Sequence, residues 1–131
     1  MESCPQGIFL NTRKQENRVF SDSEIEKYVS ATHWCNHPEA KGLLRVDPKY
    51  YKTHKDKDYI VFGLMTLGGD LIKKNEIEEA AVAYFKAFKI DAENATVKKF
   101  LRWCGEPNSV EDVERAIRAR KEIRARKIGQ E

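Results

Sequence analysis

Residues 59–94, YIVFGLMTLGGDLIKKNEIEEAAVAYFKAFKIDAEN, decide the fold of this 131-residue chain. Two segments of the stretch place apolar residues every three or four positions, which is the spacing of one face of an α-helix. These positions are Val61, Leu64, Leu67, Leu71 and Ile72 in the first segment, and Ile77, Ala80, Ala81, Tyr84, Ala87 and Phe88 in the second. Asn75 lies between them, and asparagine tolerates the left-handed conformation in which many helices end. The stretch predicts a helical hairpin, with Asp58 as the N-cap of its first helix.

The order of large and small residues from 61 to 94 resembles one tetratricopeptide repeat, a helix–turn–helix unit of about 34 residues. The matching positions are Leu64, Leu67, Gly68 and Leu71 in the first helix, and Ala80, Tyr84 and Ala87 in the second. Ala92 departs from the family pattern, which closes with proline. When the pattern is moved 34 residues toward the C-terminus, only Leu101 matches a position of the first helix. When it is moved 34 residues toward the N-terminus, Val46 and Thr53 fall where the pattern needs small residues. We therefore expect a single tetratricopeptide-like hairpin within a small bundle, and not a solenoid.

Start and stop signals on both sides of the hairpin indicate further helices. Ser21 or Ser23 can cap one helix, and Ser109 can cap the last one. Gly105 and Pro107 end the helix that precedes Ser109. The proline at position 48 is expected to break a short helix before it. The expected helices cover residues 22–34, 39–46, 95–104 and 109–128. The predicted fold is all-α: about five helices in one domain, residues 22–131, with residues 1–21 as an extended N-terminal arm.

Composition restricts the class of protein. Apolar residues make up 40% and charged residues 34% of the chain, which fits a compact core with a large solvated or partner-covered surface. The longest apolar run, YIVFGLMTL from Tyr59, is too short to cross a bilayer. The first residues lack the charged-then-apolar order of a secretory signal, and three cysteines form no disulfide framework. We expect a cytoplasmic protein that does not bind a membrane.

The basic residues are unevenly distributed. Residues 115–127 hold seven basic residues and one acid, while the rest of the chain, with 17 basic and 20 acidic residues, has a net charge of −3. A segment of this kind is typical of contact with an anionic partner. Residues 41–57 add six basic residues and two acids, with a tyrosine pair that can stack on unpaired bases.

The predicted RNA- or anion-binding residues are Lys41, Arg45, Lys49, Tyr50, Tyr51, Lys52, Lys55 and Lys57 in the first stretch, and Arg115, Arg118, Arg120, Lys121, Arg124, Arg126 and Lys127 in the second. The alternative is that the lysines only solvate a loop and the arginines pair with acids in the first turn of their own helix. That pairing accounts for the start of the helix but not for residues 120–127, where Glu122 is the one acid.

A cluster of nitrogen and sulfur donors raises the possibility of zinc. His33, Cys35 and His37 lie at two-residue spacing, and Cys4 or Cys104 would complete a tetrahedral site. The alternative is a helix end with exposed histidines. Catalysis is not expected, because Trp34 occupies the position where a zinc protease motif has its glutamate. Gly68 and Gly69 lack the lysine and hydroxyl residue of a phosphate-binding loop. We predict no catalytic residues, no small-molecule substrate and no cofactor apart from this zinc hypothesis.

These observations favour a non-enzymatic binding factor for a large RNA-containing particle, above all the ribosome. Ribosomal RNA and proteins, or another large anionic assembly, would be its partners, and its role would be assembly, stability or dormancy. The alternative is a tetratricopeptide-like protein–protein adaptor, or a structural subunit of a large multi-protein complex.

Overall fold

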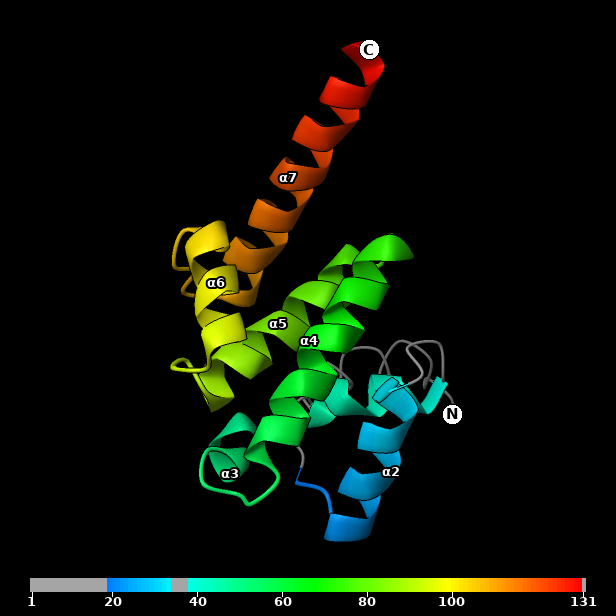
Figure 1. Ribbon diagram of the computed structural model, residues 1–131, viewed down its shortest axis with the longest axis vertical. Coiled ribbons are helices and arrows are strands. Elements are labelled where there is room, and N and C mark those ends of the chain that lie inside the picture. The colour runs from blue at the N-terminus through cyan, green and yellow to red at the C-terminus, as the bar shows by residue number, and fades with distance from the viewer. Residues whose placement is uncertain (1–18, 34–37, 131) are drawn as a thin grey trace, which may run out of the picture.

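The computed structural model describes residues 19–33 and 38–130. In these residues the fold is all-α, which confirms the predicted class (Figure 1). The helices are α2 (Asp22–His33), the 3-10 helix η1 (Pro38–Arg45), α3 (Pro48–Tyr51), α4 (Lys57–Lys73), α5 (Ile77–Ile90), α6 (Ala95–Cys104) and α7 (Val110–Gln130). None of these described helices has the length and apolar character needed to cross a membrane.

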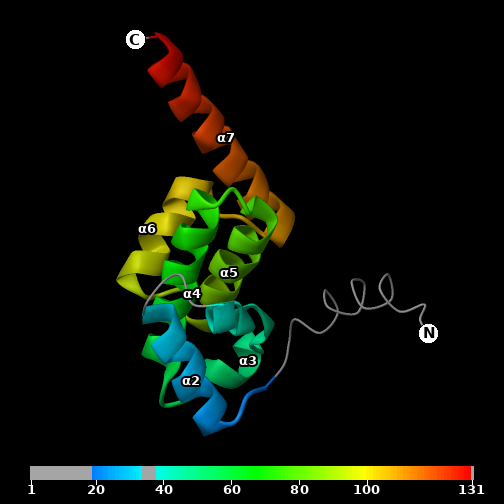
Figure 2. The same ribbon diagram turned by 90° about the vertical axis from the view of Figure 1, so that its right-hand side faces the viewer.

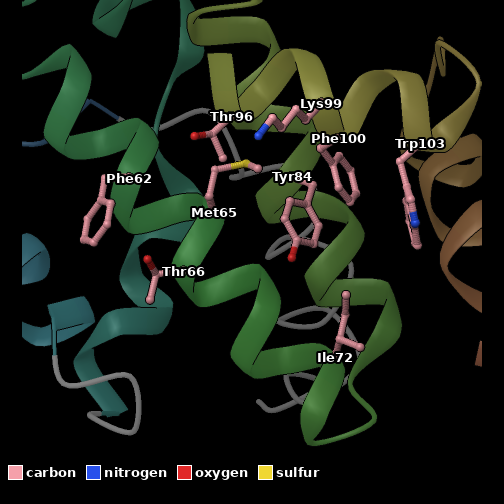
Figure 3. Close-up of a pocket in the computed structure, with 9 residues that line it drawn as sticks. All are labelled: Phe62, Met65, Thr66, Ile72, Tyr84, Thr96, Lys99, Phe100 and Trp103. Carbon is pink, nitrogen blue, oxygen red and sulfur yellow. The ribbon is translucent and has the colours of Figure 1, made fainter. Parts of the chain in front are cut away.

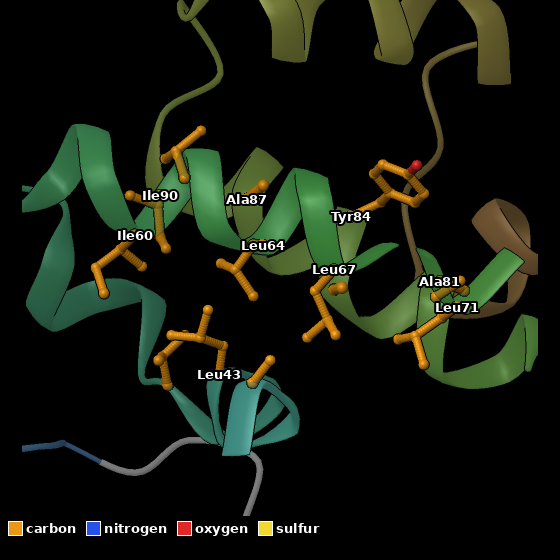
Figure 4. Packing of buried hydrophobic residues seen from close by; sticks show 14 of the residues in the cluster. Leu43, Ile60, Leu64, Leu67, Leu71, Ala81, Tyr84, Ala87 and Ile90 are labelled. Carbon is orange, nitrogen blue, oxygen red and sulfur yellow. The ribbon is translucent and has the colours of Figure 1, made fainter. Parts of the chain in front are cut away.

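Helices α4 and α5 form the predicted hairpin at the centre of the molecule, where Leu64, Leu71 and Ala87 are fully buried (Figure 4). The two helices approach closely at Gly68, because a Cβ atom there would lie 2.8 Å from the Tyr84 ring. Asn75 joins the helices with a positive φ of 64°, as its position in the sequence predicted.

Helices α2, η1 and α3 cover one end of the hairpin (Figure 1). Tyr51 on α3 is fully buried, and its hydroxyl accepts a hydrogen bond of 3.1 Å from the amide of Phe20. Lys86 on α5 is also buried, and its Nζ donates to the carbonyl of Val46 at 2.8 Å. These two contacts fix the segments before α2 and after η1 to the body of the molecule.

The helix before Pro48 ends as expected, since η1 stops at Arg45. Pro48 also begins α3, which was not expected, because proline suits the first turn of a helix and Asp47 accepts a hydrogen bond from the Lys49 amide. One expected helix cap was wrong. Asp58 was expected to cap α4, but it lies inside the first turn, because the helix begins one residue earlier and Asp56 occupies the cap position.

The predicted end of α6 and start of α7 are confirmed. Gly105 ends α6 in the left-handed conformation with a φ of 73°, and Asn94, which was not predicted, caps its start. The hydroxyl of Ser109 accepts a hydrogen bond from the Asp112 amide at the start of α7. The first half of α7 packs on α5 through the buried Val113 and Ile117, whereas its second half extends beyond the other helices in both views (Figures 1 and 2).

Candidate binding surfaces

Three of the predicted basic residues between 41 and 57 are ion-paired. Lys41 Nζ lies 2.6 Å from Glu76 and 3.4 Å from Glu79, which links η1 to the start of α5. The hydrogen bond from Lys41 lowers the pKa of Glu76, and the same bond raises the pKa of Lys41. Burial raises the pKa of Glu79. The other two pairs are Lys55 with Asp22 at 3.9 Å and Lys57 with Asp91 at 3.7 Å.

Arg45, Lys49 and Lys52 are exposed and have no acidic partner within the described residues. Tyr50 beside them is accessible. The prediction that Tyr51 stacks on a base needs correction, because its ring is fully buried and has no free face. Burial also raises the pKa of the Tyr51 hydroxyl, which remains a neutral acceptor for the backbone.

Four basic residues of α7 contact other groups of the protein, and three more lie on its projecting end. Arg115 pairs with Asp112 at 3.2 Å and Arg118 pairs with Glu114 at 2.9 Å, both within the helix. Lys121 Nζ donates to the side-chain oxygen of Asn75 at 3.2 Å, and the Arg120 guanidinium lies 5.0 Å from the ring centre of Trp103. Arg124, Arg126 and Lys127 follow on the projecting end of α7, and their side chains lie outside the described part.

The fold does not bring the two basic stretches together. Helix α3 lies at one end of the molecule, and the free end of α7 lies at the other (Figure 1). One compact anion cannot contact both, so they are either separate surfaces or two contacts on a partner larger than the protein.

The predicted zinc ligands Cys4, Cys35 and His37 lie outside the described residues, as does the side chain of His33, the last residue of α2. Cys104, the other candidate for this site, is half-buried at the end of α6. The zinc hypothesis stays a prediction.

A different group of potential ligands, which the sequence did not suggest, lies between α2 and α4. One ligand atom from each of Asp22, His54 and Asp56 lies within 4.8 Å of the others. His54 Nδ1 accepts the Asp56 amide at 3.1 Å, so a neutral ring carries its proton on Nε2, which faces Asp22 at 3.3 Å. Both ring nitrogens are therefore used in hydrogen bonds that join the start of α2 to the loop before α4.

An open groove of about 600 Å³ lies between α4 and α6 (Figure 3). Its lining residues are Phe62, Met65, Thr66, Ile72, Tyr84, Thr96, Lys99, Phe100 and Trp103. Phe62 is 57% exposed at the edge of the groove, and Lys99 is the one charged residue in the lining. An exposed apolar surface of this kind is typical of a binding site.

Stacked aromatic rings line one side of this groove. The rings of Tyr84 and Phe100 stack with their centres 3.9 Å apart, and Phe100 stacks on Trp103 at 5.3 Å. Because Gly68 has no side chain, the Tyr84 ring can lie directly against α4. These contacts fix the wall of the groove, while the edge of the groove remains open.

Two weak acids beside the groove have raised pKa values. Burial, and to a lesser extent Cys104, raises the pKa of Tyr84 to about 12. Burial raises the pKa of the Cys104 thiol to about 11, against a smaller opposite effect of Arg120. Both groups are neutral at physiological pH, so Tyr84 retains its hydroxyl proton for donation and Cys104 is a poor nucleophile.

The sequence contained part of the signal for this groove. Phe62, Met65 and Thr66 lie on a second face of α4, beside the face that forms the core. Ile72, which we expected on the core face, is only partly buried and also lines the groove. Trp103 and Phe100 lie on α6 in the same way. Periodicity shows that Phe62, Met65 and Thr66 leave the core face of α4, but it does not show that no other helix covers them.

Comparisons of the chain with protein families, with curated proteins and with solved structures find no match.

Proposed function

We propose that this protein is a non-enzymatic binding factor that docks on a large RNA-containing particle, above all the ribosome, through α7. The observation that carries the proposal is the projection of the basic half of α7 beyond the body (Figures 1 and 2). Its role on the particle would be in assembly, stability or dormancy.

The charges on this helix support an anionic partner. Arg120 and Arg124 lie four residues apart, and Arg124 and Lys127 lie three apart, so like charges are neighbours on the helix surface. Within the described part of the helix, Asp112 pairs with Arg115 and Glu114 pairs with Arg118. Phosphate groups would relieve the repulsion and release counterions, which gives affinity without sequence readout.

Exposed cations at the opposite end of the molecule offer a second contact. Arg45, Lys49 and Lys52 can each meet a phosphate without breaking an ion pair within the described residues. Since they lie far from the end of α7, a partner that meets both sets must be larger than the protein itself. This separation supports a particle over a small RNA.

The experiment measures the binding of fluorescent ribosomal RNA fragments to the full chain by anisotropy at several salt concentrations. A variant with Arg124, Arg126 and Lys127 changed to glutamine should bind more weakly and show a salt slope shallower by about two to three. The matched control changes Arg115 and Arg118, which are already paired, and should show a smaller loss. Equal losses in both variants, or binding independent of salt, would contradict the proposal.

A second candidate function is a protein–protein adaptor. The apolar groove between α4 and α6 favours it, because phosphate recognition does not require an exposed phenylalanine beside a partly buried tryptophan. The resemblance of residues 61–94 to a tetratricopeptide repeat is consistent with this function.

A further inference from the structure

We infer that the groove between α4 and α6 binds an acidic amphipathic helix of a partner protein, with the Tyr84 hydroxyl donating a hydrogen bond to it. The inference rests on the second candidate function and is independent of RNA binding by α7. It specifies which residues make the site and what chemistry the partner must have.

The shape of the groove suits a helix. Its two walls are helices, and α4, with 17 residues, is about 25 Å long. Phe62 and Ile72 lie ten residues apart on the α4 wall and both line the groove, so the apolar surface is elongated. A helix laid along it would present apolar residues at three- and four-residue spacing, as in other helix-in-groove complexes.

The Tyr84 hydroxyl is a hydrogen-bond donor in the lining of the groove. Tyr84 is only 9% exposed, and within the described residues its hydroxyl has no hydrogen bond. Figure 3 shows this hydroxyl among the other side chains that line the groove. Tyrosine hydroxyls normally have a hydrogen-bond partner, and a helix bound in the groove can supply the acceptor in place of solvent.

The ring that carries this hydroxyl is held in place. Gly68 lies against one part of it and Phe100 stacks on it, so the oxygen has a fixed position. A fixed donor loses little freedom on binding and selects for an acceptor at one point of the partner. A glutamate, glutamine or backbone carbonyl oxygen of the partner would satisfy it.

The charges around the groove favour an acidic partner. Lys99 lines it, and Arg102 on the same helix is exposed with no acidic partner in the described part of the chain. Arg120 lies over the Trp103 ring at the far edge. Helix α6 contains three basic residues and no acid. Charge complementarity therefore selects glutamate and aspartate on the polar face of the bound helix.

The same charges argue against other occupants. A second copy of the chain that docked through α7 would bring the basic half of that helix toward other cations. RNA bases can stack on Trp103, but the lining provides only one lysine for the phosphates, and phosphate contacts dominate the affinity of RNA.

The experiment selects displayed random 16-residue peptides on the full-length protein and then measures the anisotropy of the selected peptides with variants. Selected sequences should be rich in Asp and Glu, with Leu or Phe at helical spacing. Phe62→Ser and Lys99→Glu should each weaken binding about tenfold or more. The matched controls are Tyr59→Ser, exposed on α4 outside the groove, and Lys98→Glu, which is adjacent to Lys99 but pairs with Glu93. Both controls should bind within about twofold of the unaltered protein.

Tyr84→Phe tests the hydrogen bond. It removes only the hydroxyl, so the thermal unfolding of the protein should not worsen, while peptide affinity should fall about fivefold. Unchanged affinity in this variant would overturn the assigned role of Tyr84. Failure to select any peptide, selection of basic peptides, or equal binding by the groove variants and their controls would overturn the site. Ribosomal RNA fragments should not displace the peptides from the α7 glutamine variant. Displacement would show that the groove binds RNA instead.

The two proposals can fail separately. Phe62→Ser should leave the salt-dependent binding of RNA unchanged, and the glutamine variant of α7 should leave peptide binding unchanged. Loss of RNA binding in the groove variant would overturn the independence of the two surfaces.

Discussion

Gly68 and Gly69 are adjacent in α4, and alanine should have opposite effects at these two positions. Alanine is favoured over glycine in a helix interior by about 1 kcal/mol. At Gly69 the new Cβ would lie 3.6 Å from the Tyr84 hydroxyl, an ordinary contact, so Gly69→Ala should stabilise the protein by about 0.5–1 kcal/mol. At Gly68 the Cβ would lie 2.8 Å from two ring carbons of Tyr84.

Tyr84 has little room to move away, because its ring stacks on Phe100 with the centres 3.9 Å apart. Overpacking costs about 1–3 kcal/mol, which exceeds the gain in helix propensity. Gly68→Ala should therefore destabilise the protein by about 1 kcal/mol, and the two variants should differ by about 2 kcal/mol.

Urea unfolding followed by circular dichroism at 222 nm measures both effects. The Tyr84→Leu background is the control, since a smaller side chain leaves space for the Cβ and Gly68→Ala should there become neutral or stabilising. If Gly68→Ala stabilises the unaltered protein as much as Gly69→Ala does, the described approach of α4 to the Tyr84 ring is wrong.

Two further predictions concern reactivity and the fixed position of α3. In a Cys4→Ser, Cys35→Ser variant, Cys104 should react with iodoacetamide about 100-fold more slowly at pH 8 than an ordinary thiol, because burial raises its pKa from 9.0 to about 11. Its rate should rise about tenfold per pH unit up to that pKa, and a plateau near pH 9 would contradict the burial. Tyr51→Phe removes the acceptor of the Phe20 amide and should destabilise the protein by about 1–2 kcal/mol in urea unfolding. An unchanged unfolding midpoint would show that this hydrogen bond does not hold the segment before α2.

Local signals predicted most of the fold. Some signals involve only residues that are close in the sequence, so they can be recognised directly in it. They are the helical spacing in the hairpin, the turn at Asn75 and the helix end at Gly105. Ser109 likewise caps α7 as expected. Helix α3 was not predicted, because proline not only ends a preceding helix, as Pro48 does, but also suits the first turn of a new one.

The pairing of charges could not be predicted, because it depends on contacts far apart in the sequence. Lys41 meets Glu76 across 35 positions, and Lys57 meets Asp91 in the same way. Tyr51 looked like a stacking residue beside Tyr50, but tertiary packing buries one ring of the pair and leaves the other accessible.

The groove could not be predicted either, because it also depends on how helices far apart in the sequence pack. A second apolar face on α4 can be covered by another helix or left for a partner, and the pattern of Phe62 and Met65 is the same in both cases. Only the position of α6, which stays apart from α4 and leaves the groove open, distinguishes them. The basic half of α7 was visible in the sequence, whereas its distance from α3 was not.

The most direct test of the central claim is sedimentation of the native protein from a cell lysate on sucrose gradients, at low and high salt, with and without RNase. The account predicts co-migration with ribosomal particles that is lost at high salt, after RNase, and in the variant with Arg124, Arg126 and Lys127 changed to glutamine. Migration in a small, RNase-resistant complex that the glutamine variant leaves intact would contradict it.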